Sequence, residues 1–149
     1  MTATVPATEK YYVGLTQNYS QVIDDKLVRA FAEVTGDRNP IHLDDETAKQ
    51  SRFGRRVAHG AILFGIISKV LGMDMPGAGT VYLSQVCNFK LPVFIGDTVT
   101  LEAKIVEILP KSVARISTVI KKQTGEVVMD GEAQAKLPGS KPLAADSCR

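Results

Sequence analysis

The second half of the chain alternates apolar and polar residues with the period of a β-strand. Every second residue from Val99 to Ile105 is apolar, and polar residues occupy the positions between. Such alternation places the apolar side chains on one face of a strand. Further strands are predicted over residues 113–121 and 126–136, with Thr124-Gly125 as the turn between them. We therefore expect several long antiparallel strands after residue 80.

The first half shows helical periodicity instead. Apolar residues recur at helical spacing within residues 24–35, and Gly36 follows as a helix stop. Residues 37–42 are polar, contain a proline and predict a loop. Asp44 is placed to cap a short helix that runs to about residue 51. Residues 60–72 are apolar nearly all round, which is typical of a helix buried in a core.

The order of these elements, helices first and strands afterwards, predicts an α+β fold in which a curved antiparallel sheet packs on a central apolar helix. The chain has 149 residues, a length that suits one domain. We expect this domain to span residues 1–137. Residues 138–149 are rich in Pro, Ala and Ser and predict a flexible C-terminal tail. Without an internal repeat, a single copy of such a sheet leaves an edge to be covered.

Composition and charge exclude several classes of protein. The net charge is +2 and the basic residues are scattered, so no nucleic-acid-binding surface is predicted. Arg52, Arg55 and Arg56 form a small basic group that could meet a phosphorylated ligand. The longest apolar stretch, residues 61–67, is far shorter than the ~20 residues of a membrane helix. The N-terminus resembles neither a signal nor a transit peptide, which predicts a cytoplasmic protein, or a mitochondrial matrix protein if the chain is a processed precursor.

Metal and cofactor motifs are missing from the sequence. The two cysteines, Cys87 and Cys148, and the two histidines, His42 and His59, do not have the spacing of a zinc site. No glycine-rich dinucleotide fingerprint and no Gly-x-Ser-x-Gly nucleophile motif occurs. We expect neither a metal nor a cofactor.

Candidate chemistry begins with Asp37 and His42, five residues apart in the predicted loop. A carboxylate and an imidazole in one loop could hold a water between them for general acid–base catalysis. An aspartate that caps the local backbone beside a surface histidine explains the same spacing, and spacing alone favours that structural interpretation.

Four other polar or glycine positions are further candidates. His59-Gly60 precedes the apolar helix, whose first N–H groups could bind a carbonyl oxygen, or it is an ordinary helix start with a structural histidine. Asn39 could orient a neighbour or satisfy the backbone of the loop. Ser68 could be a hydroxyl bonded to its own helix. For His59, Gly60 and Asn39, the structural alternative is the more common one.

Taken together, these residues resemble the MaoC-like (R)-specific enoyl-CoA hydratases. The run Phe-Ala-Glu-Val-Thr-Gly-Asp-Arg-Asn-Pro-Ile-His, residues 31–42, is similar to the hydratase-2 motif of that family. Further similar segments are Val57-Ala58-His59-Gly60, Leu71-Gly72, Met75-Pro76-Gly77, Tyr82-Leu83-Ser84-Gln85, Phe89-Lys90-Leu91-Pro92 and Gly96-Asp97. The resemblance covers about residues 15–137. The motif at residues 31–42 is specific for this family in combination with the later His59-Gly60.

The resemblance implies a hot-dog fold and a homodimer whose sheets join at their edges. It implies that Asp37 and His42 are catalytic and hold the water that adds to a trans-2-enoyl-CoA, giving an (R)-3-hydroxyacyl-CoA. It places Gly60 as the backbone donor to the thioester oxygen, with His59 beside it. It also implies that Asn39 supports the catalytic pair and that Ser68 lies near the site.

The sequence leaves other functions open. The same chemistry could run as a 3-hydroxyacyl-[acyl-carrier-protein] dehydratase, because the basic residues suit either CoA phosphates or an acidic carrier protein. A hot-dog thioesterase usually carries an acidic residue on the central helix, and residues 60–69 contain none. A non-catalytic acyl-CoA-binding subunit of the same fold is the alternative from another class, and the intact Asp37 and His42 argue against it.

Overall fold

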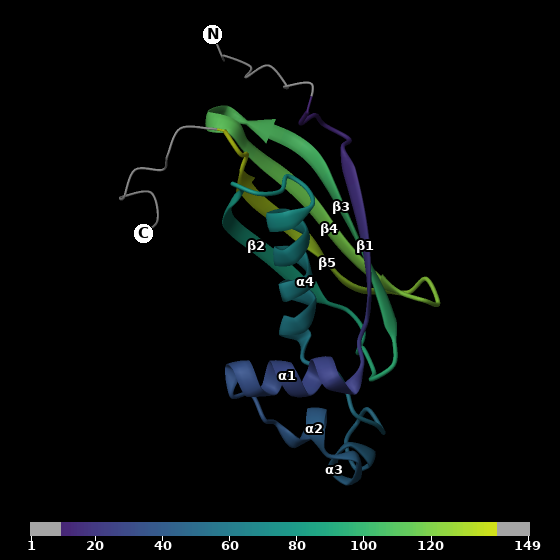
Figure 1. Cartoon of the computed structure of the whole chain (residues 1–149). Helices are drawn as coiled ribbons and strands as arrows, with labels where there is room; N and C mark the ends of the chain where they lie inside the picture. The colour runs from purple at the N-terminus through teal and green to yellow at the C-terminus, as the bar shows by residue number, and fades with distance from the viewer. Residues whose placement is uncertain (1–9, 140–149) are drawn as a thin grey trace.

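The structure is a computed structural model that describes residues 10–139 as a five-stranded antiparallel sheet with helices on one face and beyond one end (Figure 1). Its strands lie in the order β1-β3-β4-β5-β2. The elements are β1 Thr16–Val22, α1 Asp25–Thr35, α2 Pro40–Leu43, α3 Asp45–Lys49, α4 Gly60–Met73, β2 Val81–Phe89, β3 Thr98–Leu109, the 3₁₀ turn η1 Pro110–Ser112, β4 Val113–Lys122 and β5 Val127–Lys136. The predicted later strands, and the turn at Gly125, are confirmed.

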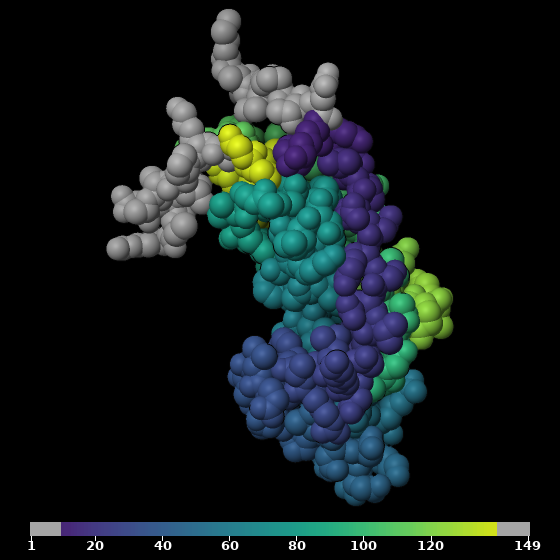
Figure 2. All heavy atoms as spheres, in the orientation of Figure 1, coloured from purple at the N-terminus to yellow at the C-terminus, as the bar shows by residue number. Residues whose placement is uncertain are grey.

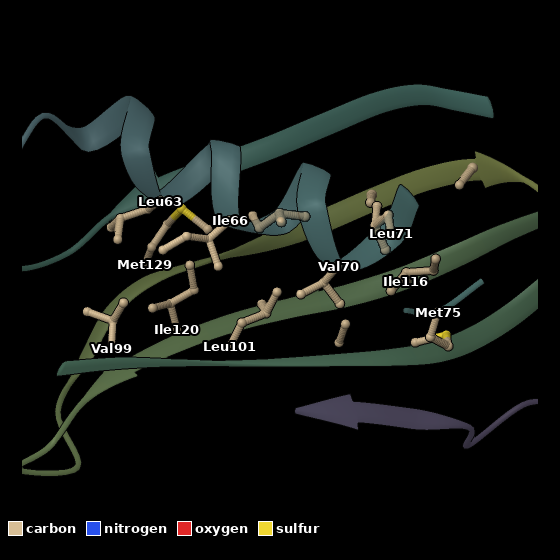
Figure 3. Close-up of a cluster of buried hydrophobic side chains, with 14 of the residues drawn as sticks. Leu63, Ile66, Val70, Leu71, Met75, Val99, Leu101, Ile116, Ile120 and Met129 are labelled. Atoms are coloured by element: carbon tan, nitrogen blue, oxygen red, sulfur yellow. The ribbon is translucent and has the colours of Figure 1, made fainter. Parts of the chain in front are cut away.

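The core lies between one face of the sheet and α4. Alternate residues of β3, from Val99 to Ile105, are fully buried, as their period predicts. In Figure 3, Leu63, Ile66 and Val70 of α4 point toward the side chains of the central strands, Leu101, Ile116, Ile120 and Met129 among them. Burial of a large aliphatic side chain contributes about 1.5–3 kcal/mol. This wrapping of a sheet around one helix is the predicted hot-dog fold.

One face of α4 is open, which corrects the prediction of a helix buried all round. Ala61, Phe64 and Ser68 are exposed, at the spacing of one helical stripe. Phe64 is 42% exposed, and its ring centroid lies 5.7 Å from that of Tyr82 on β2. The sheet covers only one side of α4, so its other side lies open at the front of the molecule, in teal in Figure 2.

The sequence pattern did not predict the strand β1. Its sequence is mostly polar, so it shows no apolar alternation. It pairs with β3 from Thr16 opposite Lys104 to Val22 opposite Thr98. Backbone hydrogen bonds to a neighbouring strand, rather than an apolar face, therefore hold β1 at the sheet edge.

Residues 24–59, here called the helical overhang, lie beyond the end of the sheet and beside the start of α4 (Figure 1). Asp24 caps α1 by accepting a hydrogen bond from the Leu27 N–H at 2.8 Å, and Gly36 ends it with a left-handed φ of 79°. The prediction of a loop over residues 37–42 is wrong in its second half, because Pro40 begins the one-turn helix α2. Proline suits a first helical position, where no N–H is needed.

None of the helices within residues 10–139 has the length and apolar character needed to cross a bilayer. The domain limits of 1–137 and the flexible tail at 138–149 stay predictions. Residues 1–9 and 140–149, with Cys148 among them, lie outside the described part of the chain.

Candidate active site

The helical overhang brings Asp37, His42 and His59 to one place. A carboxylate oxygen of Asp37 and one ring nitrogen of each histidine lie within 4.8 Å of one another. The three residues come from the loop after α1, from α2, and from the position before α4. The sequence motif predicted the proximity of the first two, and folding of the chain adds His59.

Hydrogen bonds from backbone N–H groups to nearby side chains shape the loop that carries Asp37. The Asp37 N–H donates to Thr35 Oγ1 at 3.1 Å, and the Asn39 N–H donates to Asp37 Oδ1 at 3.3 Å. Asn39 in turn caps α2, because its Oδ1 accepts from the Ile41 N–H at 3.2 Å. Asn39 therefore organises the backbone between Asp37 and His42, and its contacts are those of the structural alternative.

His42 is held by its Nδ1, which lies 2.7 Å from the Val57 carbonyl oxygen. A carbonyl can only accept, so this nitrogen carries the proton and Nε2 of the neutral ring keeps its lone pair. The pKa of His42 is lowered from its ordinary 6.5, chiefly because burial disfavours the imidazolium and also because His59 lies close by. The hydrogen bond to Val57 and the charge of Asp37 oppose that lowering of the pKa. His42 is thus a neutral acceptor at pH 7.

His59 lies behind this pair and is only 2% exposed. Its Nε2 donates to the backbone carbonyl of Asp37 at 2.9 Å. Its ring centroid lies 3.9 Å from that of His42 and 4.7 Å from that of Phe31. Within residues 10–139, its buried Nδ1 has no hydrogen-bond partner. The contacts make His59 a buried support that links the Asp37 backbone to the His42 ring.

Asp37, His42 and His59 are also residue types that bind metals, and one ligand atom of each lies within 4.8 Å of the others. The ring centroids of His42 and His59 lie 3.9 Å apart, and the rings are tilted by 31°. Each histidine has one ring nitrogen bonded to a backbone carbonyl, an arrangement that metal-binding histidines share. The cluster therefore has the ligand types for either a water or an ion.

Gly60 is the first residue of α4, where a helix leaves its N–H groups without an internal acceptor. It lines a hollow of about 380 Å³ together with His59, Leu63 and Phe89. A Cβ at Gly60 would lie 3.0 Å from the Phe89 ring, so a larger residue at this position would require that ring to move. The cations Arg52 and Lys90 also line this hollow.

Ser68 is not brought to the cluster. It lies eight residues after Gly60 on α4, about 12 Å along the helix axis at 1.5 Å per residue. It is exposed on the open face of α4 that carries Phe64. Within one chain, Ser68 therefore does not contact Asp37 or His42.

Three contributors to the site were missed by the sequence analysis. Phe31 packs its ring against His59, the Val57 carbonyl accepts from His42, and Arg56 bonds the His42 backbone. A backbone carbonyl has no signal in the sequence, and Phe31 is indistinguishable from an ordinary apolar position of an amphipathic helix. Arg56 belonged to the basic group of the sequence, but nothing in the sequence indicated that its role differs from that of Arg55.

Comparisons with known proteins agree on one family. Residues 11–129 match the MaoC like domain. The 3-hydroxybutyryl-CoA dehydratase of Methylorubrum extorquens is 46% identical over 131 residues, which cover 87% of this chain and 83% of that protein. The (R)-specific enoyl-CoA hydratase of Aeromonas caviae is 43% identical over 127 residues, covering 85% and 95%. A solved (R)-hydratase from A. caviae, involved in PHA biosynthesis, superposes with a TM-score of 0.85 at 39% identity, covering 88% of this chain and 100% of that one.

Proposed function

The chain belongs to the MaoC-like family, and we propose that it is an (R)-specific enoyl-CoA hydratase. In this reaction, water adds reversibly to trans-2-enoyl-CoA and gives (R)-3-hydroxyacyl-CoA. The observation that carries the proposal is that a carboxylate oxygen of Asp37 and a ring nitrogen of His42 lie at a separation that suits one bridging water. The named activities of the relatives, a dehydratase and a hydratase, are the two directions of this one hydro-lyase reaction.

The spacing of the cluster determines how water is held. Two hydrogen bonds of about 2.8 Å that meet at a water at a tetrahedral angle join groups roughly 4.5 Å apart. The oxygen of Asp37 and the ring nitrogen of His42 lie within 4.8 Å. Because both groups accept, they receive both O–H bonds of the water and leave its lone pairs directed at the substrate.

The chemical step follows from this placement. The water oxygen attacks Cβ of the enoyl group while one of the two acceptors takes its proton. The π electrons move toward the thioester, and the negative charge that develops on its oxygen is stabilised by the Gly60 N–H at the helix start. The proton then passes to Cα on the same face. All atoms of the water are retained in the product, so no cofactor is required.

The hollow beside Gly60 suits the CoA part of the substrate. It is lined by the cations Arg52 and Lys90 and by apolar residues such as Leu91. Cations attract the phosphates of CoA, and apolar walls suit the pantetheine arm. We therefore include an acyl-CoA thioester as the substrate in the proposal.

A homodimer is part of the same proposal. The free edge of β2 carries the exposed apolar residues Val81, Leu83 and Val86, beside the open face of α4. An open apolar edge favours pairing with another strand. Joining two copies there would cover Phe64 and place Ser68 within the shared interface. Light scattering should give twice the chain mass of 16.1 kDa, and an active monomer would contradict this part of the proposal.

The test is an absorbance assay with crotonyl-CoA and longer enoyl-CoAs, with chiral analysis of the product. We expect loss of the enoyl-thioester band and an (R)-3-hydroxyacyl product. Turnover restricted to carrier-protein thioesters would instead favour the 3-hydroxyacyl-[acyl-carrier-protein] dehydratase. Binding of acyl-CoA without turnover on either substrate would favour the non-catalytic subunit.

We expect the activity in the cytoplasm, or in the mitochondrial matrix for a processed precursor.

A further inference from the structure

The three arginines near the site have three different environments. Arg52 lines the hollow that reaches Gly60. Arg55 lies over the ring of Phe94, with 3.9 Å from its guanidinium carbon to the ring centroid. The side chain of Arg56 is only 10% exposed, so it is turned into the helical overhang and away from solvent. A phosphate-binding role therefore does not suit Arg56, and its contacts indicate another.

Arg56 joins two helices that carry the site. Its Nε donates to the backbone carbonyl of His42 at 2.7 Å. Its Nη2 donates to Oδ1 of Asp25, in the first turn of α1. The planar guanidinium presents its N–H groups in a rigid fork, so one side chain can fix both partners in direction as well as distance.

The helix that carries His42 needs such support. α2 has four residues, and a single helical turn is not stable by itself. The Val57 N–H donates to the Ile41 carbonyl at 3.3 Å, and His42 Nδ1 donates to the Val57 carbonyl. Together with the bond from Arg56, these contacts hold His42 by its ring and by its backbone. Of these three contacts, the one from Arg56 also reaches α1, through Asp25.

We propose that Arg56 is a positioning residue, which holds His42 in its reactive orientation by bridging the His42 carbonyl to Asp25. The inference rests on the proposed catalytic role of His42. Loss of the bridge leaves a half-buried carbonyl without its donor and frees α2 to shift. A displacement of about 1 Å at a reacting group can lower the rate by up to ~10²-fold. We expect little change in substrate binding at Gly60 and the hollow, because Arg56 does not line that hollow.

Steady-state kinetics on enoyl-CoA test this role with Arg56→Gln, Arg56→Lys and Asp25→Asn. We expect Arg56→Gln to lower kcat about tenfold with KM within about twofold, because a positional error acts on the chemical step. Arg56→Lys retains one donor and should recover part of kcat. Asp25→Asn should lower kcat less than Arg56→Gln, and the double variant should be no slower than Arg56→Gln alone, because Asp25 acts through Arg56.

Arg29→Gln is the matched control. Arg29 pairs with the other carboxylate oxygen of Asp25 at 2.9 Å, but its side chain is 54% exposed and does not touch His42. We expect its kcat and KM to equal those of the unmodified protein. Circular dichroism and thermal melts of every variant separate a loss of kcat from a loss of folded protein.

A spectroscopic readout makes the test independent of rate. The chain has only two histidines, so their ring nitrogens can be assigned by NMR with a His42→Ala reference. We expect the Nδ1–H tautomer of His42 in the unmodified protein and a shift toward the Nε2–H tautomer in Arg56→Gln. Unchanged kcat and tautomer in Arg56→Gln would overturn the proposal, as would a raised KM with unchanged kcat, which indicates phosphate binding. If His42→Ala itself keeps full activity, the proposed function fails first.

Discussion

The helical overhang and the body formed by α4 and the sheet are held together by different forces. The body supplies most of the buried apolar residues, with Ile67, Leu101 and Ile120 fully inaccessible. The overhang buries little more than Val28, Ala32 and Ala48 on its helices. Its short elements are fixed instead by caps, an ion pair and histidine contacts to backbone carbonyls. The body therefore provides stability, and the overhang provides orientation for Asp37 and His42.

The largest effect on stability is expected from the body. Ile67→Ala removes a fully buried side chain from α4 and leaves a cavity, so the free energy of unfolding should fall by about 2–5 kcal/mol. Urea denaturation measures the loss. Val34→Ala, on an α1 side chain that is 86% exposed, is the matched control and should change stability by less than about 0.5 kcal/mol. Similar losses at both positions would remove the distinction between the two regions.

The largest effect on activity is expected from the overhang. Asp37→Asn and His42→Ala each remove one of the two acceptors of the water, so hydratase activity should fall ~10²-fold or more. Thermal melts should show a nearly unchanged fold, because Asp37 is exposed and His42 only half-buried. Initial rates with crotonyl-CoA provide the measurement. Rates like those of the unmodified protein in either variant would exclude that residue from the mechanism.

Loss of a helix cap in the overhang should lower stability and activity by smaller amounts. Asn39→Ala removes the acceptor for the Ile41 N–H at the start of α2, which costs about 1 kcal/mol of stability. We expect a several-fold lower kcat as well, because α2 carries His42. Asp44→Ala is the control, since Asp44 caps α3 through Thr47 and does not touch the cluster. It should lose similar stability and keep its rate, and an equal loss of rate in both variants would contradict a specific role for Asn39.

The smallest change in activity is expected when the pH is varied. Water activation needs neutral His42, and protonation of its Nε2 removes one acceptor. The pKa of His42 lies below its ordinary 6.5, mainly because of burial, so more than half of the rings are neutral at pH 6.5. The midpoint of the decline in rate should thus lie below pH 6.5. A pH–rate profile tests this, and a midpoint above pH 6.5 would contradict the direction of the shift.

Local patterns predicted much of this molecule because they reflect contacts within one element. The alternation along β3 and the apolar run of α4 each place side chains on a face that must be buried, and both elements formed as expected. Gly36 marked the end of α1 through the left-handed backbone conformation that glycine favours. The motif that contains Asp37 and His42 likewise identified the family and the candidate pair.

Contacts between distant segments were decided only by the tertiary structure. The polar strand β1 exists because β3 offers it a backbone partner, and the open stripe on α4 exists because the sheet covers one side only. The order Arg52, Arg55, Arg56 does not reveal that one arginine lines the hollow, one stacks on a ring and one holds His42. Backbone carbonyls have the same chemistry in every residue, so the partners of His42 and His59 become visible only when the chain is folded.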